Sequence, residues 1–150
     1  MWKNYKLGFD GWALLLFLLV MLPNFLWFFV PAPNDVLRAE SVTGAVDTIA
    51  SVCQVLLVAA LCVLRNQNCG RLRFTPLLSG ALLCVFLYFL SWAFYYRGIV
   101  TAAVLLGLTL PPCLAFLFFA LARKNYIAAI PISLFTVCHM IYAFANFIFK

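Results

Sequence analysis

The sequence predicts an all-α integral membrane protein, a bundle of five transmembrane helices that forms one domain over residues 1–150. Two observations predict this class. The chain is 67% hydrophobic and only 9% charged, whereas soluble domains are about half apolar and about a quarter charged. The apolar residues also form five long runs, and a helix needs about 20 apolar residues to cross the hydrocarbon core of a bilayer.

Short polar segments separate the apolar runs and set the boundaries of the expected helices. Lys3 and Lys6 precede the first run, and Asp35, Arg38 and Glu40 lie in the polar stretch that follows it. Three arginines lie between the second and third runs, at positions 65, 71 and 73. The predicted transmembrane spans cover about residues 11–30, 45–64, 75–96, 99–121 and 126–149.

Prolines interrupt two of these spans. Pro23 lies in the second half of the first span, and Pro111-Pro112 lies in the middle of the fourth. Proline lacks the backbone N–H that a helix interior uses, and its ring clashes with the carbonyl one turn earlier. We therefore expect a kink in the first span and a break or bend in the fourth.

The distribution of basic residues predicts the orientation. The segments on the side of the N-terminus carry seven basic residues, Lys3, Lys6, Arg65, Arg71, Arg73, Arg123 and Lys124. The other side carries three, Arg38, Arg97 and Lys150. Cytoplasmic loops hold the excess of Lys and Arg, so we expect a cytoplasmic N-terminus and an outward-facing C-terminus, in the plasma (inner) membrane. The net charge of +6 reflects this topology, and no nucleic-acid partner is expected.

Polar residues recur at helical spacing within three of the spans. Residues three, four and seven apart share one face of a helix. Such stripes are formed by Asp47, Ser51 and Gln54 in the second span, by Cys84, Tyr88, Ser91 and Tyr95 in the third, and by Thr136, His139 and Asn146 in the fifth.

The depths of these residues suggest a shared pocket. At 1.5 Å per residue, Gln54, Tyr88 and His139 lie roughly 12–15 Å from the outer surface, and Asn24 and Ser91 roughly 8–10 Å from it. Asp47 and Asn146 lie near that surface. We therefore expect a ligand pocket that opens outward and is lined by Asn24, Asp47, Gln54, Tyr88, Ser91, His139 and Asn146.

A structural role for the same residues stays open. Polar side chains in membrane helices also hydrogen-bond across helix contacts and so hold a bundle together. Asp47 is either a ligand-binding or proton-binding group, or a solvated carboxylate at the start of a helix. His139, the one histidine in the chain, is either a proton relay, an axial haem ligand or a core histidine with satisfied hydrogen bonds.

No motif for a metal site or a catalytic site is present. The six cysteines form no C-x-x-C pair and no zinc spacing with histidine. The sequence has no Gly-rich phosphate loop and no H-E-x-x-H motif. We therefore expect no metal and no cofactor, and an enzyme is the less favoured class.

The architecture is similar to that of the tryptophan-rich sensory (translocator) proteins. Those proteins also have about 150 residues, five spans and many aromatic residues, and the last span, from Ile130-Pro131-Ile132 to Ala143-Phe144-Ala145-Asn146, looks like theirs. Their Trp-rich, Pro-Pro segment between the first two spans is missing, and Pro31-Ala32-Pro33-Asn34-Asp35 does not replace it. The resemblance implies a five-helix bundle with a ligand pocket and assigns no role to any residue.

Two functional hypotheses follow. In the first, the protein binds or transports a small molecule through the outward-facing polar and aromatic pocket, as a homodimer if it transports. In the second, it is a non-catalytic accessory or structural subunit of a larger membrane complex, and its polar stripes face outward to meet a partner helix. Both hypotheses place the chain in a lipid bilayer.

Overall fold

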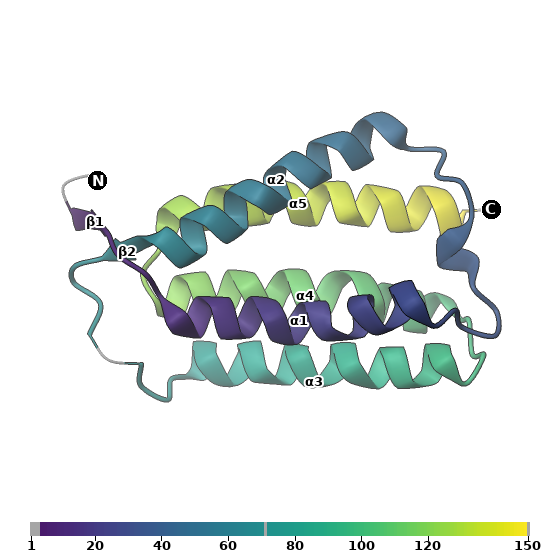
Figure 1. The fold of residues 1–150 in the computed structure, drawn as a ribbon, viewed down its shortest axis with the longest axis horizontal. Helices are drawn as coiled ribbons and strands as arrows, with labels where there is room; N and C mark the ends of the chain where they lie inside the picture. Colours follow the sequence, from purple (N-terminus) through teal and green to yellow (C-terminus); the bar gives the residue numbers. More distant parts are fainter. Residues whose placement is uncertain (1–3, 71, 150) are drawn as a thin grey trace.

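Five long helices make up most of the structure, a computed structural model that describes residues 4–70 and 72–149 (Figure 1). They are α1 (Gly11–Phe29), α2 (Gly44–Val63), α3 (Pro76–Tyr96), α4 (Ala102–Ala122) and α5 (Tyr126–Ala143), and a π-helical turn, Phe144–Ile148, extends α5. All five are long and apolar enough to cross a membrane. The helical fold is confirmed, and it points to a multi-pass integral membrane protein.

The fourth helix differs most from its prediction. It begins at Ala102 rather than at residue 99, because the Thr101 side chain accepts a hydrogen bond from the Val104 N–H and caps the helix there. It also continues through Pro111 and Pro112 without a break, so the expected break is wrong. Packing against neighbouring helices keeps such a helix intact where proline removes a backbone donor.

A small β-sheet at one end of the bundle was not predicted. Strand β1 (Tyr5–Leu7) pairs antiparallel with β2 (Leu64–Asn66), which begins at the last residue of the predicted second span and continues into the segment expected to be a loop. The pairing continues beyond the strands, because the Asp10 N–H donates to the Cys62 carbonyl at 2.8 Å. The sheet therefore ties the start of α1 to the end of α2.

The helices form two groups. Figure 1 shows α2 with α5 on one side and α1, α3 and α4 on the other, and α4 packs along both α3 and α5. Helix α1 approaches α2, α3 and α4 at fewer places. The sheet marks the end of the bundle that we call the sheet end, and residues 30–43, which connect α1 to α2, mark the opposite loop end.

Small side chains lie where the helices meet, and large apolar ones face outward. Helices α1, α2, α3 and α5 each expose several leucine, phenylalanine, valine or isoleucine side chains, and only 22–28% of the most apolar stretch of each is buried, whereas the more central α4 is 44% buried. Lipid can cover such a surface, whereas water does so at a large cost in free energy. The helices approach one another closely at alanines that are at most 2% exposed: Ala13, Ala81, Ala115, Ala120, Ala128 and Ala143.

A buried ion pair holds the sheet end together. Asp10 accepts hydrogen bonds from the N–H groups of Trp12 and Ala13 at the start of α1. Its second oxygen lies 2.8 Å from Arg123 Nε and 2.7 Å from Arg123 Nη2, and both side chains are less than 10% exposed. Arg123 also donates to the Gly70 carbonyl. Because a buried pair stabilises a fold only when its remaining polar atoms are bonded, these additional contacts are essential to it.

Two asparagines complete this end. Asn125 donates to the carbonyls of Ala60 and Leu64, at 2.9 and 2.8 Å, and so satisfies acceptors at the end of α2. Asn66 in β2 donates to the Lys124 carbonyl at 2.8 Å. The segment between α4 and α5 is thereby fixed to α2 and to the sheet.

The contact between α3 and α4 generates the first prediction. A Cβ atom at Gly107 would overlap the Ser91 side chain, so Gly107→Val should lower the free energy of unfolding by about 1–3 kcal/mol through overpacking. Thermal unfolding of the detergent-purified protein, followed by circular dichroism, measures this change. Ala103→Val, one turn earlier on the exposed surface of α4, is the matched control; an equal loss of stability in both variants would contradict the close approach.

Candidate functional site

Two adjoining cavities lie inside the bundle. The middle cavity has a volume of about 230 Å³ and lies between α1, α2, α3, α4 and α5 at mid-length. The end cavity has a volume of about 290 Å³ and lies nearer the loop end. Both are lined by Asn24, Gln54, Leu108, Phe135 and His139, which lie where the two cavities meet.

The polar stripe of α2 faces the end cavity. Asp47, Ser51 and Gln54 all line it. The Ser51 hydroxyl donates to the Asp47 carbonyl at 2.9 Å, and Thr43 Oγ1 donates to Asp47 Oδ1 at 3.0 Å. Helical spacing therefore brings the carboxylate and the amide to one wall of the cavity, with the carboxylate nearer the loop end.

Gln54 and His139 differ from most polar side chains of the helices. Neither the Gln54 amide nor the His139 imidazole has a hydrogen-bond partner among the described residues. The hydroxyl groups within the helices instead donate to the carbonyl one turn earlier, as Ser51, Ser79, Ser91, Thr109, Ser133 and Thr136 all do. The cavity is thus the place where side chains keep unused hydrogen-bonding capacity.

Asn24 and Tyr88 form the opposite polar wall. Asn24 Nδ2 donates to the Tyr88 hydroxyl at 2.7 Å and to the Val20 carbonyl at 3.1 Å. Tyr88 is only 2% exposed, so its phenol is held between α1 and the core. Both Asn24 N–H groups are engaged, which leaves the Asn24 carbonyl oxygen as the acceptor on this side.

Aromatic rings surround His139. The Phe135 ring lies 4.4 Å from the imidazole, centroid to centroid, at an interplanar angle of 31°. The Tyr142 ring lies 6.1 Å from it on the other side, at 32°. Because Phe135 and Tyr142 are four residues before and three residues after His139, one face of α5 presents three rings to the cavities.

Trp92 carries an unsatisfied polar atom in the cavity wall. Its side chain lines the end cavity, is 5% exposed, and its Nε1–H group has no hydrogen-bond partner among the residues that the structure describes. Tyr88 and Tyr95 pack edge-on against it at centroid distances of 6.3 and 5.6 Å. Buried indole N–H groups are normally bonded, and this one approaches the Tyr88 hydroxyl without reaching the geometry of a full hydrogen bond, so it is a weakly satisfied donor in the cavity wall.

Sequence reasoning missed several lining residues. Trp27, Trp92 and Tyr142 all line the end cavity. Each is one helical turn from a residue of the predicted site: Trp27 from Asn24, Trp92 from Tyr88 and Tyr142 from His139. The helical spacing of the predicted site residues therefore also places these three aromatic side chains at the cavity.

The loop between α1 and α2 forms the wall of the end cavity at the loop end. Leu37 lines that cavity, and its N–H donates to the Tyr95 hydroxyl at 3.2 Å. The Tyr95 hydroxyl in turn donates to Asp35 Oδ1 at 2.8 Å. Residues of this loop therefore lie beside the place where the pocket is predicted to open outward.

Asp35 is the centre of the loop. Burial alone would raise the pKa of its carboxyl group, but hydrogen bonds from Trp27, Tyr95, Arg38 and the Ala32 N–H outweigh burial and hold the pKa below its ordinary value. Trp27 Nε1 reaches both carboxylate oxygens, at 2.9 and 3.0 Å, and Arg38 Nε lies at 2.8 Å. The carboxylate therefore orients the Trp27 ring that lines the end cavity.

Ser91 and Asn146 lie outside the two cavities. Ser91 packs against Gly107 at the contact between α3 and α4. Asn146 is 4% exposed and fastens the start of α2, because its Oδ1 accepts from the Val42 N–H at 2.9 Å and its Nδ2 donates to Thr43 Oγ1 at 3.0 Å. The polar atoms of both residues already have partners within the chain: Ser91 donates to the Leu87 carbonyl of its own helix, and Asn146 bonds the segment before α2.

Of the seven residues expected in the pocket, five lie together along the two cavities: Asn24, Asp47, Gln54, Tyr88 and His139. Within residues 4–70 and 72–149, no group of three His, Cys, Asp or Glu side chains could hold a metal ion. No protein-family profile, curated protein or solved structure matches the chain.

The Asp35 cluster generates a prediction about pH. Because the pKa of Asp35 is lower in the folded protein, the carboxylate stabilises the fold above its ordinary pKa of 3.8, and this stabilisation is lost as the pH falls through the folded value. Asp35→Asn should lower the free energy of unfolding at pH 7 by about 1–3 kcal/mol, because a charged acceptor is lost.

Thermal unfolding of both proteins in detergent between pH 7 and pH 3 measures this difference, which should shrink at the lowest pH values. Glu40→Gln, which removes an exposed carboxylate from the same loop, is the control and should leave the stability unchanged. A gap between wild type and Asp35→Asn that stays constant down to pH 3 would contradict the role of the charge.

Proposed function

We propose that this chain is a multi-pass membrane protein that binds, and in a membrane transports, a small molecule in the two adjoining cavities. One observation carries the proposal: Gln54 and His139 line both cavities while their polar atoms have no hydrogen-bond partner among the described residues. Both side chains are partly exposed, so their polar atoms can be reached by a molecule that enters the cavities. A bound molecule that offers donors and acceptors would satisfy both side chains.

The direction of the polar stripes favours this function over an accessory subunit. A subunit that recruits a partner helix through polar residues would present them on its outer surface. Gln54 and His139 instead line the interior of the bundle, and the outward faces of α2 and α5 carry Val52, Val55 and Ile141. These outward faces suit lipid.

The size of the cavities favours a small ligand. An apolar cavity of about 150 Å³ accommodates a benzene ring, and the middle cavity has a volume of about 230 Å³. Phe17, Phe116 and Phe135 contribute to its apolar lining. A molecule with one ring and one polar substituent would place the ring among the phenylalanines and the substituent beside Gln54.

We further propose that the sheet end faces the cytoplasm of the plasma (inner) membrane. Five of the described basic residues, Lys6, Arg65, Arg73, Arg123 and Lys124, lie at the sheet end and its connections, against two at the loop end, Arg38 and Arg97, which is the bias of cytoplasmic loops. The loop end and the C-terminus then face outward, so a ligand would enter from that side or from the bilayer. Five helices are few for a complete transporter, and a homodimer is the expected transporting form.

Replacement of the two unpaired side chains tests ligand binding. The double variant Gln54→Leu/His139→Leu should retain the fold and lose at least tenfold in affinity for any bound probe, because it removes the two unpaired polar side chains that line both cavities. Three single-ring probes, benzamide, phenyltrimethylammonium and phenylacetate, are titrated against the detergent-purified protein, and quenching of tryptophan fluorescence reports binding at Trp27 and Trp92.

Ser133→Ala/Thr48→Ala is the matched control. It removes two exposed hydroxyl groups from α5 and α2 that lie outside both cavities and already bond to their own helices, and binding should be unchanged. The proposal fails if none of the three probes binds the wild type saturably, or if the double leucine variant binds them as tightly as the wild type does.

The natural cysteines test the orientation. Cys69 lies at the sheet end and is partly exposed, whereas Cys53, Cys62, Cys84 and Cys113 are buried. A membrane-impermeant maleimide should therefore leave Cys69 unlabelled in intact cells and label it in inside-out vesicles. A Glu40→Cys variant at the exposed loop end should show the reverse, since Glu40 lies on the other side. Labelling of Cys69 in intact cells would overturn the proposed orientation.

A further inference from the structure

We propose that the ligand of the end cavity is a small organic cation, such as a protonated or quaternary amine, whose charge lies beside Asp47. This inference rests on the proposed binding function and names the class of ligand. It depends on the charges, the aromatic rings and the unpaired polar groups that the fold gathers around this cavity.

Asp47 is the one acidic residue that lines either cavity. The sequence contains four acidic residues, and two of them form ion pairs, Asp10 with Arg123 and Asp35 with Arg38. Glu40 is exposed on the loop. Among the described residues Asp47 forms no ion pair, and its carboxylate receives one side-chain hydrogen bond, from Thr43.

No described lysine or arginine side chain lines the middle cavity or the end cavity. The neutral polar groups are amides, hydroxyls and the imidazole of His139. A carboxylate in a site sheltered from water attracts a cation more strongly than it does in bulk water, because the effective dielectric constant is lower. An anionic ligand would meet the Asp47 charge with no lysine or arginine side chain to offset it.

The rings around Asp47 are suited to a cation. Trp27, Trp92 and Tyr142 line the same cavity, and the faces of such rings attract ammonium and guanidinium groups. Arg38 already uses this interaction at the loop end, where its Cζ atom lies 4.9 Å from the centroid of the Trp27 ring. Groups of aromatic rings are a common arrangement for binding quaternary ammonium groups.

A second, independent observation marks the cavity as a ligand site. The Gln54 amide lines the cavity with no hydrogen-bond partner among the described residues, and the buried Nε1–H group of Trp92 has only a weak approach to the Tyr88 hydroxyl. A carboxylate at the first turn of α2 is by itself explained by the helix dipole. The unpaired groups have no such explanation, and they would bond the acceptor and donor atoms of the rest of the ligand.

The experiment compares two isosteric probes. Phenyltrimethylammonium and tert-butylbenzene have nearly the same shape and differ by one positive charge. The wild-type protein in detergent should bind the cation at least tenfold more tightly than the hydrocarbon and than phenylacetate, as measured by quenching of tryptophan fluorescence. This comparison requires no variant, so it does not depend on the folding of any mutant.

Substitution of Asp47 locates the charge. Asp47→Asn should weaken the binding of phenyltrimethylammonium at least tenfold and leave that of tert-butylbenzene unchanged. Glu40→Gln makes the same change of charge at the same end of the protein, outside both cavities, and should have no effect on either probe. Unfolding temperatures of the variants establish that they are folded.

Each outcome decides between the two proposals. Preference for the cation that is lost in Asp47→Asn supports the inference. Binding of benzamide or tert-butylbenzene with no preference for the cation, or a preference that Asp47→Asn retains, overturns the ligand class and leaves the binding function intact. Absence of saturable binding by every probe overturns both.

Discussion

The structure depends on one constraint: within hydrocarbon, the polar groups of the chain must find partners in the chain itself. Hydroxyl groups such as those of Ser133 and Thr136 satisfy it by donating to a carbonyl of their own helix. At the sheet end, Asp10 and Arg123 satisfy it by bonding each other and nearby backbone groups. Against this background, the unpaired groups of Gln54, His139 and Trp92 are exceptions, and all three line the end cavity.

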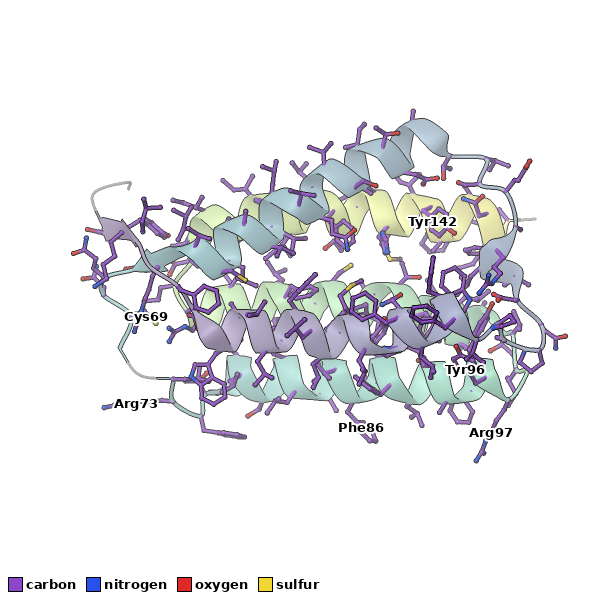
Figure 2. The ribbon with its side chains drawn as sticks, in the orientation of Figure 1. Cys69, Arg73, Phe86, Tyr96, Arg97 and Tyr142 are labelled. Carbon is purple, nitrogen blue, oxygen red and sulfur yellow. The ribbon has the colours of Figure 1, made fainter. Side chains whose placement is uncertain are left out.

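The two ends of the bundle are built differently, and this difference creates the cavities. At the sheet end, strand pairing and the contacts of Asn125 draw α1, α2 and α5 together. Toward the loop end, α2 diverges from α1, as Figure 1 shows. The end cavity lies between the helix groups there, and Tyr142, labelled on α5 in Figure 2, lines it. The Asp35 cluster then fixes the far end of α1, with Trp27 and Tyr95 donating to its carboxylate. Helix α1 is thus anchored at both ends and lines the cavities between them.

Hydropathy predicted the five helices because each apolar run has the length that a membrane span requires, and helical spacing placed Asp47 and Gln54 on one wall. The same spacing misplaced Asn146, because a face of a helix does not reveal which distant backbone group its side chain will bond. Asn146 bonds Val42, more than 100 residues earlier in the sequence. The pair of Asp10 with Arg123 and the pairing of β1 with β2 are also contacts between distant segments, and no local pattern encodes them.

The distribution of charge links the position of the cavities to the class of ligand. Among the described residues, the sheet end and its connections carry five basic residues and one acidic residue, Asp10, whereas the loop end carries two basic and three acidic residues. A cation that approached from the sheet end would meet a strongly positive surface, but the loop end carries more acidic than basic residues. There Arg38 forms an ion pair with Asp35, whereas Asp47 forms no ion pair among the described residues. A bundle oriented by its basic residues therefore has its acidic cavity at the end where a positive molecule meets the least repulsion.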